Sequence, residues 1–215
     1  MLVKLWMTAP PLTVEPSATV GDAAVMMGRH HVRRLLVVDS ADTAGRLQGI
    51  VSLLDVARAF PADLNPLSAS AVDGPRMPIR EIMTSDVATA YPTMPVAVAA
   101  RILREKKVGG LPVVVKGVPV GIITESDVFR AVIEMSGIRR EGTSVTLLVP
   151  PEETPMKIAA AAETAGLQIE NFFTVQSEGV RTMTMRARGT ISADEVEVLY
   201  GYGWKILDVH PEVAR

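Results

Sequence analysis

The chain has 215 residues, a formal net charge of −2 and a hydrophobic fraction of 48%, which is typical of a globular protein with a buried core. Because acidic and basic residues nearly balance, the net charge favours neither nucleic acid nor an anionic membrane surface as a partner. The absence of cysteine excludes disulfide bonds and thiolate metal sites. The apolar runs are shorter than a bilayer span and the first residues lack the pattern of a signal peptide, so we expect a soluble, cytoplasmic protein.

Residues 1–60 predict the element order β-α-β-β-α. A hydroxyl residue followed three positions later by an acid marks the start of each helix. Continuous apolar runs between turn residues indicate buried strands. The expected elements are an extended segment Leu12–Glu15, a helix opened by Thr19 and Asp22, strands Leu35–Asp39 and Leu47–Val51, and a short helix from Ser52 toward Phe60.

The same order returns in Pro78–Val132, which aligns with Val3–Phe60 as an internal repeat. Only two copies are present, which favours two units packed face to face over a solenoid. The expected elements are a strand Val87–Tyr91, a helix with Pro95 in its first turn and Met94 or Thr93 as its cap, strands Leu111–Val115 and Val120–Thr124, and a helix from Thr124 to about Glu134.

Two polar breaks divide the chain. Residues 61–77 are rich in proline and lack a periodic pattern, which predicts a linker, and Ser136–Gly142 is a shorter break. Residues 143–215 then predict the order β-α-β-β-α-β, the split βαβ or ferredoxin-like pattern. Its expected elements are a strand at 145–149, a helix from Thr154 and Pro155 to Gly166, a hairpin across Ser177–Gly179, a helix capped by Ser192 and Glu195, and a strand Trp204–Val209.

Each copy begins with a Met-Thr pair and ends with an apolar run, a hydroxyl residue and an aspartate, as in Gly49–Asp55 and Gly121–Asp127. In this pattern each copy resembles a CBS motif, and the two resemble a CBS-domain pair, or Bateman module. Residues 143–215 resemble an ACT-like domain, and this order of units resembles the AcuB-type acetoin-utilisation family. The resemblance implies an α+β fold with CBS motifs at 1–60 and 78–135, a linker at 61–77 and a ferredoxin-like ACT-like domain at 143–215.

The resemblance also implies two adenosine-binding clefts, because the aspartate of the S/T-x-x-D motif in CBS pairs typically binds ribose hydroxyls. An ionised carboxylate can accept two hydrogen bonds from a vicinal diol, and the N-terminus of a helix attracts a phosphate. Each cleft would combine the end of one repeat with early residues of the other. In one cleft Ile122, Thr124, Ser126 and Asp127 would face Thr8, Leu12, Val32, Arg33 and Arg34; in the other Ile50, Ser52 and Asp55 would face Thr84, Val87, Val108, Gly109 and Gly110.

Two alternatives stay open for these residues. Ser52 with Asp55 and Thr124 with Asp127 also fit capping boxes, which many helix starts use. The arginines at 33 and 34 can clamp a phosphate in bidentate geometry, or they can point into solvent. If they clamp a phosphate, their place opposite Asp127 predicts tighter binding of a phosphorylated adenosine in that cleft.

No nucleophile–base–acid arrangement is visible, so we expect no catalytic residue and no enzyme activity. With no cysteine and three histidines, the sequence also offers no zinc ligand set. The resemblance implies a regulatory sensor that binds AMP, ADP, ATP or S-adenosylmethionine and modulates its own assembly or a partner enzyme, in acetoin or acetate metabolism. The alternative is a ligand-free dimerisation scaffold whose S/T-x-x-D motifs only cap helices. A homodimer is expected in both cases, through apolar helix positions at Val20, Ala24, Met27, Val96, Ala100 and Leu103.

Overall fold

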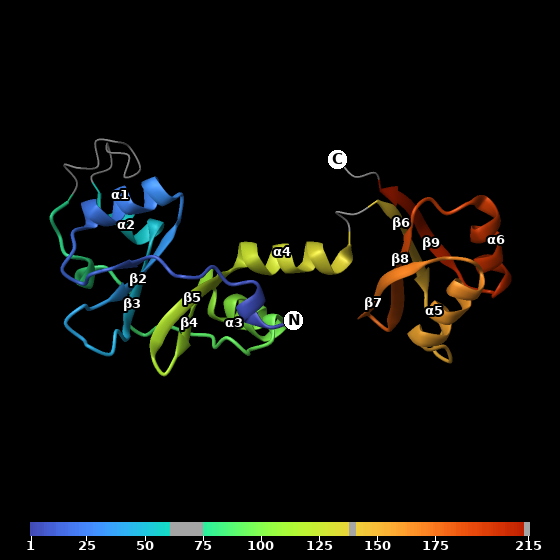
Figure 1. Ribbon diagram of the computed structural model, residues 1–215, viewed down its shortest axis with the longest axis horizontal. Helices are drawn as coiled ribbons and strands as arrows, with labels where there is room; N and C mark the ends of the chain where they lie inside the picture. The colour runs from blue at the N-terminus through green and yellow to red at the C-terminus, as the bar shows by residue number, and fades with distance from the viewer. Residues whose placement is uncertain (61–74, 138–140, 213–215) are drawn as a thin grey trace. The chain divides into compact units, whose positions relative to one another are not determined.

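The computed structural model describes residues 1–60, 75–137 and 141–212. Most of the predicted linker at 61–77, and residues 138–140 of the predicted break at Ser136–Gly142, lie outside the described residues. The chain divides into two compact units, Met1–Phe129 and Arg130–Arg215. Figure 1 shows the first unit in blue to yellow-green and the strands of the second in yellow to red.

The first repeat contains the elements predicted from the sequence. The Thr19 hydroxyl accepts a hydrogen bond from the Asp22 N–H at 3.0 Å, and the Asp22 carboxylate accepts one from the Thr19 N–H at 3.0 Å. This capping box fixes the start of the first long helix, as predicted. The elements are η1 (Val3–Leu5), β1 (Thr13–Val14), α1 (Val20–His30), β2 (Arg34–Val38), β3 (Leu47–Ser52) and α2 (Leu53–Ala59), with β1 parallel and β3 antiparallel to β2.

The second repeat lacks one predicted strand. Residues 87–91 form only an isolated bridge, in which Ala90 pairs with Val113. In the first repeat the Leu36 N–H donates to the Leu12 carbonyl at 3.0 Å. The second repeat has Pro112 at the position of Leu36, and proline has no N–H to donate. The elements that form are η3 (Ile79–Glu81), α3 (Val96–Lys106), β4 (Gly110–Val115), β5 (Val118–Thr124) and α4 (Glu125–Ser136), with β4 and β5 antiparallel.

The start of α3 also differs from the prediction. Pro95 is the N-cap residue itself, with an extended ψ of 136°, rather than a residue of the first turn. Proline has no side-chain acceptor, so this cap makes no side-chain hydrogen bond. The N-terminal segment of the chain compensates, because the Val96 N–H donates to the Met1 carbonyl at 3.1 Å.

A core within the first repeat buries most of the residues expected at a dimer interface. Val20, Ala24 and Met27 pack with the strand residues Leu35 and Val51 in one cluster. Val96 and Leu103 are likewise buried, whereas Ala100 is half-buried. The interface expected at these positions is therefore wrong, because the helix stripe that the sequence indicates faces the protein's own sheet.

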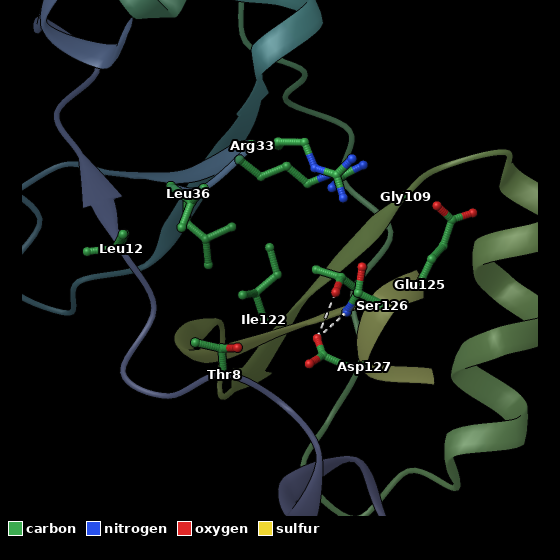
Figure 2. A pocket seen from close by; sticks show the side chains of 12 residues that line it. Thr8, Leu12, Arg33, Leu36, Gly109, Ile122, Glu125, Ser126 and Asp127 are labelled. Atoms are coloured by element: carbon green, nitrogen blue, oxygen red, sulfur yellow. Dashed lines mark hydrogen bonds between the residues drawn. The ribbon is translucent and has the colours of Figure 1, made fainter. Parts of the chain in front are cut away.

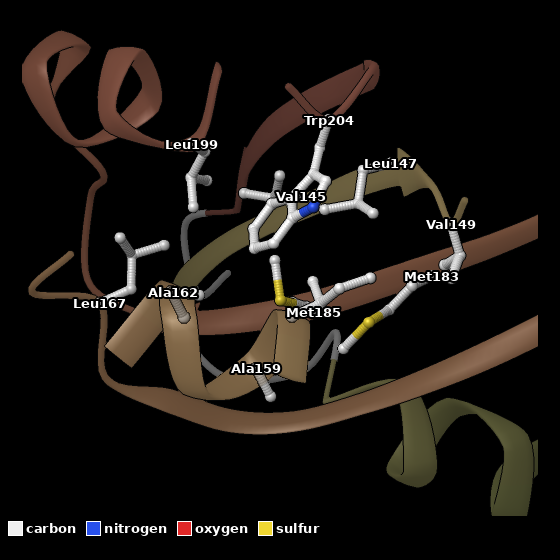
Figure 3. Packing of buried hydrophobic residues seen from close by; sticks show 12 residues of the cluster. Val145, Leu147, Val149, Ala159, Ala162, Leu167, Met183, Met185, Leu199 and Trp204 are labelled. Atoms are coloured by element: carbon white, nitrogen blue, oxygen red, sulfur yellow. The ribbon is translucent and has the colours of Figure 1, made fainter. Parts of the chain in front are cut away.

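The second unit has the predicted element order β-α-β-β-α-β. Its strands form one antiparallel sheet in the order β7-β8-β6-β9. Methionines of β8 and valine and leucine of β6 pack with residues of both helices and with Trp204, as Figure 3 shows. The elements are β6 (Gly142–Leu148), α5 (Pro155–Thr164), β7 (Ile169–Ser177), β8 (Val180–Arg188), α6 (Ala193–Gly201) and β9 (Ile206–Glu212).

Within the described ranges, none of the helices combines the length and the apolar character needed to cross a membrane.

Candidate functional site

The Met-Thr segment of each repeat pairs with a strand of the other repeat. Thr8 pairs with Ile122 of β5, and Thr84 pairs with Ile50 of β3, each through an antiparallel bridge. The approach is close, because a Cβ at Gly121 would lie 2.9 Å from the carbonyl oxygen of Thr8. This pairing therefore brings the early residues of each repeat beside the S/T-x-x-D motif of the other.

The first cavity, of about 320 Å³, lies beside the start of α4. Figure 2 shows Thr8 and Asp127 toward one end of this cavity and Arg33 toward the other. The cavity has hydrogen-bond acceptors at one end, cations at the other and apolar side chains between them. This arrangement suits a ligand that carries hydroxyl groups and an anionic group. The lining residues are Thr8, Leu12, Val32, Arg33, Arg34, Leu36, Gly109, Ile122, Thr124, Glu125, Ser126 and Asp127.

Asp127 is held at the start of α4 by its own helix. Its Oδ2 atom accepts a hydrogen bond from the Thr124 N–H at 2.9 Å and another from the Thr124 hydroxyl at 2.8 Å. The side chain is buried, with a relative exposure of 7% for the residue. The helix start therefore orients this carboxylate at the edge of the cavity.

The second cavity, of about 680 Å³, lies beside the start of α2. Asp55 repeats the arrangement of the first cavity, because its Oδ2 atom accepts from the Ser52 N–H at 2.9 Å and from the Ser52 hydroxyl at 2.6 Å. The Asp55 N–H donates back to the Ser52 hydroxyl oxygen at 3.3 Å. The lining residues are Arg33, Arg34, Ile50, Ser52, Leu53, Leu54, Asp55, Ala57, Thr84, Asp86, Val87, Ala88, Lys107, Val108, Gly109 and Gly110.

The structure brings together each set of residues that the sequence analysis grouped. Asp127 and the eight residues grouped with it all line the first cavity, and Asp55 and the seven residues grouped with it all line the second. The repeat alignment could have indicated two of the further lining residues, because Ala88 stands at the position of Leu12 and Leu54 at that of Ser126. The additional lining residues are Leu36, Gly109 and Glu125 in the first cavity, and Arg33, Arg34, Leu53, Leu54, Ala57, Asp86, Ala88 and Lys107 in the second.

The two arginines line both cavities rather than the first alone. The Arg34 guanidinium lies against Gly109, where a Cβ atom would overlap its Nη2 atom. Burial lowers the pKa of Arg34 below its usual value, the neighbouring Arg33 cation lowers that pKa further, and the Glu125 carboxylate raises it. Two cations and one carboxylate thus meet at the border of the cavities.

The two histidines of the first unit, His30 and His31, line neither cavity. His30 is the last residue of α1, and His31 is its C-cap in the left-handed conformation. In the part of the chain that the structure describes, no three His, Cys, Asp or Glu side chains gather in a way that could hold a metal ion.

A family model of the CBS domain matches residues 3–62 and 79–134. The chain belongs to the CBS-domain family. Both cavities of this CBS pair lie within the matched ranges, and residues 135–215 lie outside them.

Two curated relatives each match about 60% of this CBS-domain chain. The CBS domain-containing protein YhcV of Bacillus subtilis is 30% identical over 134 residues, which cover 62% of this chain and 86% of that protein. An L-aspartate semialdehyde sulfurtransferase of Methanocaldococcus jannaschii is 31% identical over 131 residues, which cover 60% of this chain but only 23% of that enzyme. The chain therefore matches about a quarter of the sulfurtransferase.

Many solved structures are similar to this chain, among them the following three. A protein assigned to acetoin utilization (AcuB) from Vibrio cholerae is 32% identical with a TM-score of 0.52, covering 64% of this chain and 94% of that one. The CBS domain pair of protein MJ0100, in complex with 5′-methylthioadenosine and S-adenosyl-L-methionine, is 31% identical with a TM-score of 0.51, covering 61% and 95%. CBSX2 in complex with AMP is 30% identical with a TM-score of 0.51, covering 62% and 96%.

Proposed function

We propose that this CBS-domain protein is a regulatory sensor that binds an adenosine-containing ligand in its two cavities. The observation that carries the proposal is the composition of each cavity, which joins the S/T-x-x-D aspartate of one repeat to the Met-Thr segment of the other. CBS pairs that are 30% and 31% identical to this chain have been solved with AMP and with methylthioadenosine and S-adenosylmethionine. The candidate ligands are accordingly AMP, ADP, ATP and S-adenosylmethionine.

The chemistry of the cavities suits such a ligand. The helix-capping bonds of both aspartates go to Oδ2. A carboxylate has two oxygens and about four lone-pair positions, so helix capping and binding of a ribose diol are compatible roles. Arg33 and Arg34 supply the cations for a phosphate, and the apolar lining suits a purine ring.

We propose a regulatory role for the cavities rather than a catalytic one. A ligand shifts an equilibrium between two states only through its different affinity for them. We propose that occupancy changes the assembly of a cytoplasmic homodimer or its contact with a partner enzyme. The likeness to AcuB supports a role in acetoin or acetate metabolism.

We also propose that residues 143–215 form an ACT-like domain. The order β-α-β-β-α-β and the antiparallel sheet β7-β8-β6-β9 support this assignment, because they match a ferredoxin-like topology. In our proposal this unit transmits the occupancy of the cavities or adds to the dimer interface.

A ligand-free scaffold is the second candidate, and the capping bonds of Asp55 and Asp127 favour it. Thermal unfolding of the full chain with AMP, ADP, ATP and S-adenosylmethionine tests the choice. Sensing predicts a rise in Tm that grows with ligand concentration, since binding to the folded state stabilises it. An unchanged Tm with every one of these ligands at millimolar concentration would leave the scaffold.

A further inference from the structure

At the border between the two cavities, equivalent positions of the two repeats carry different residues. Arg33 and Arg34 in the first repeat stand where the second repeat has Gly109 and Gly110. The arginine side chain at 34 lies over both glycines, since a Cβ at Gly109 would overlap its Nη2 atom and a Cβ at Gly110 would lie 3.1 Å from its Cδ atom. One repeat therefore supplies the cations, and the other supplies the space that they occupy.

This asymmetry leaves the two cavities with a common set of cations. Among the described residues that line the first cavity, Arg33 and Arg34 are the only lysines or arginines. The second cavity has the same two arginines and, in addition, the exposed Lys107 and the carboxylate of Asp86. A phosphate in the first cavity would therefore use the same guanidinium groups as a phosphate in the second, where Lys107 adds a third cation.

We propose that Arg33 and Arg34 form one anion-binding position that serves both cavities, so that a phosphorylated nucleoside in one cavity opposes a second phosphorylated nucleoside in the other. An uncharged nucleoside can occupy the remaining cavity without this opposition. The inference rests on the proposed function, because it assigns nucleosides to the cavities.

Two effects produce the opposition. A guanidinium that binds one phosphate in bidentate geometry has committed its parallel pair of donors. In addition, a phosphomonoester carries about −1.5 to −2 charges at neutral pH, and two such groups beside the same arginines repel each other. Screening by salt weakens this repulsion but does not abolish it within about 8 Å at physiological ionic strength.

Calorimetric titration of the full chain with AMP and with adenosine tests the inference. The cavities differ, so unequal AMP affinities alone decide nothing, and each cavity must first be measured by itself. Leu12→Trp fills the first cavity and Ala88→Trp fills the second, because these equivalent positions each line only one cavity. Melting curves of both variants establish that they fold.

We expect each single-cavity variant to bind one AMP. In the unsubstituted chain the second AMP should bind at least about tenfold more weakly than the weaker single-cavity variant does. Adenosine, which has no phosphate, should bind the unsubstituted chain twice with the affinities of the two variants.

Arg34→Ala gives a second readout that does not need the tryptophan variants. It should weaken binding of the first AMP more than binding of the second, so the two affinities become more similar. Arg104→Ala is the matched control, because Arg104 is an exposed arginine of α3 that lines neither cavity.

Two outcomes would contradict the shared anion-binding position without contradicting the proposed function. One is two AMP affinities in the unsubstituted chain that equal those of the single-cavity variants. The other is that a first adenosine weakens binding of a second adenosine as much as a first AMP weakens binding of a second AMP. That result would mean that the shape of the nucleoside, rather than its phosphate, causes the opposition. A chain that binds neither AMP nor adenosine refutes this inference and removes nucleoside monophosphate sensing from the proposed function.

Discussion

Thr8 of the first repeat and Ile122 of the second exchange two backbone hydrogen bonds, from N–H to carbonyl at 2.9 Å and in return at 3.0 Å. Thr84 and Ile50 make the equivalent pair of bonds, also at 2.9 and 3.0 Å. Each pair joins the Met-Thr segment of one repeat to the strand that precedes the S/T-x-x-D helix of the other. The two cavities therefore exist only where both repeats are folded together.

Gly121→Ala should destabilise the first unit. The added Cβ would lie 2.9 Å from the backbone carbonyl oxygen of Thr8 and 2.8 Å from Sδ of Met7, and the backbone atom cannot move aside cheaply. Overpacking of this kind costs about 1–3 kcal/mol of unfolding free energy. Urea denaturation measures the loss, with Gly201→Ala as control because a Cβ there meets nothing within 4 Å. Equal stability of the two variants would mean that the repeats can separate slightly at no cost.

The internal repeat explains why much of this fold and of both cavities could be predicted from the sequence. Aligning Gly49–Asp55 with Gly121–Asp127 places the helices and the strand pair of one repeat on those of the other, and each capping pair marks the start of a helix. The missed features depend on single residues that break the repeat. Pro112 removes the N–H that Leu36 donates in the first repeat, so the strand at 87–91 shrinks to one bridge.

It could not be predicted from the sequence that Arg33 and Arg34 line both cavities, and the reason is a different one. The alignment places Arg33 and Arg34 opposite glycines, but it carries no information on how far a long side chain reaches. Only the packing of Arg34 over Gly109 shows that the pair serves both cavities. The sequence likewise cannot tell which apolar helix face meets the chain's own sheet and which meets a partner.

Asp127→Ala and Asp55→Ala should each weaken binding of AMP. Removal of a charged hydrogen-bond acceptor costs about 1.5–3 kcal/mol, which is about ten- to a hundredfold in affinity. The same changes remove a helix cap worth about 1 kcal/mol of stability. Calorimetric titration and melting curves of both variants therefore have to be measured together.

The matched control for these variants is Asp22→Ala, which removes a capping aspartate of the same kind at α1, outside both cavities. We expect Asp22→Ala to lower Tm and to leave AMP affinity unchanged. If Asp55→Ala and Asp127→Ala behave in the same way as Asp22→Ala, the two motifs are caps only.

A homodimer remains a prediction, and its expected interface moves to the helices that follow the S/T-x-x-D motifs. Leu54 on α2 is 58% exposed, and Phe129 and Val132 on α4 are 68% and 55% exposed. A second copy of the chain would cover such side chains. Phe129→Asp should raise the Kd of the dimer by about thirty- to a thousandfold, equivalent to about 2–4 kcal/mol for a central apolar contact.

Light scattering over a concentration series measures this change. Val115→Asp serves as control, since Val115 is a 45% exposed apolar residue at the end of β4, away from both helices. An unsubstituted chain that stays monomeric at high micromolar concentration, with and without AMP, would exclude the dimer.

A chain that ends at Ser136 should fold and bind AMP with an affinity within about twofold of the full chain. Among the described residues, none that lines a cavity lies beyond Asp127, and the break predicted at Ser136–Gly142 follows α4. Within the second unit, the Asn171 side-chain amide donates to the Met135 carbonyl, so truncation removes a partner from the end of α4. That end frays readily, because the last carbonyls of a helix need partners or water.

Asn171→Ala in the full chain separates fraying from a wider effect, because it removes this contact and keeps the second unit. We expect Asn171→Ala and the truncated chain to bind AMP equally well, since the start of α4 is fixed by Thr124 and Asp127 rather than by its end. Aggregation of the truncated chain, or loss of AMP binding in it but not in Asn171→Ala, would show that the cavities need the second unit itself. The boundary predicted at Ser136–Gly142 would then be misplaced.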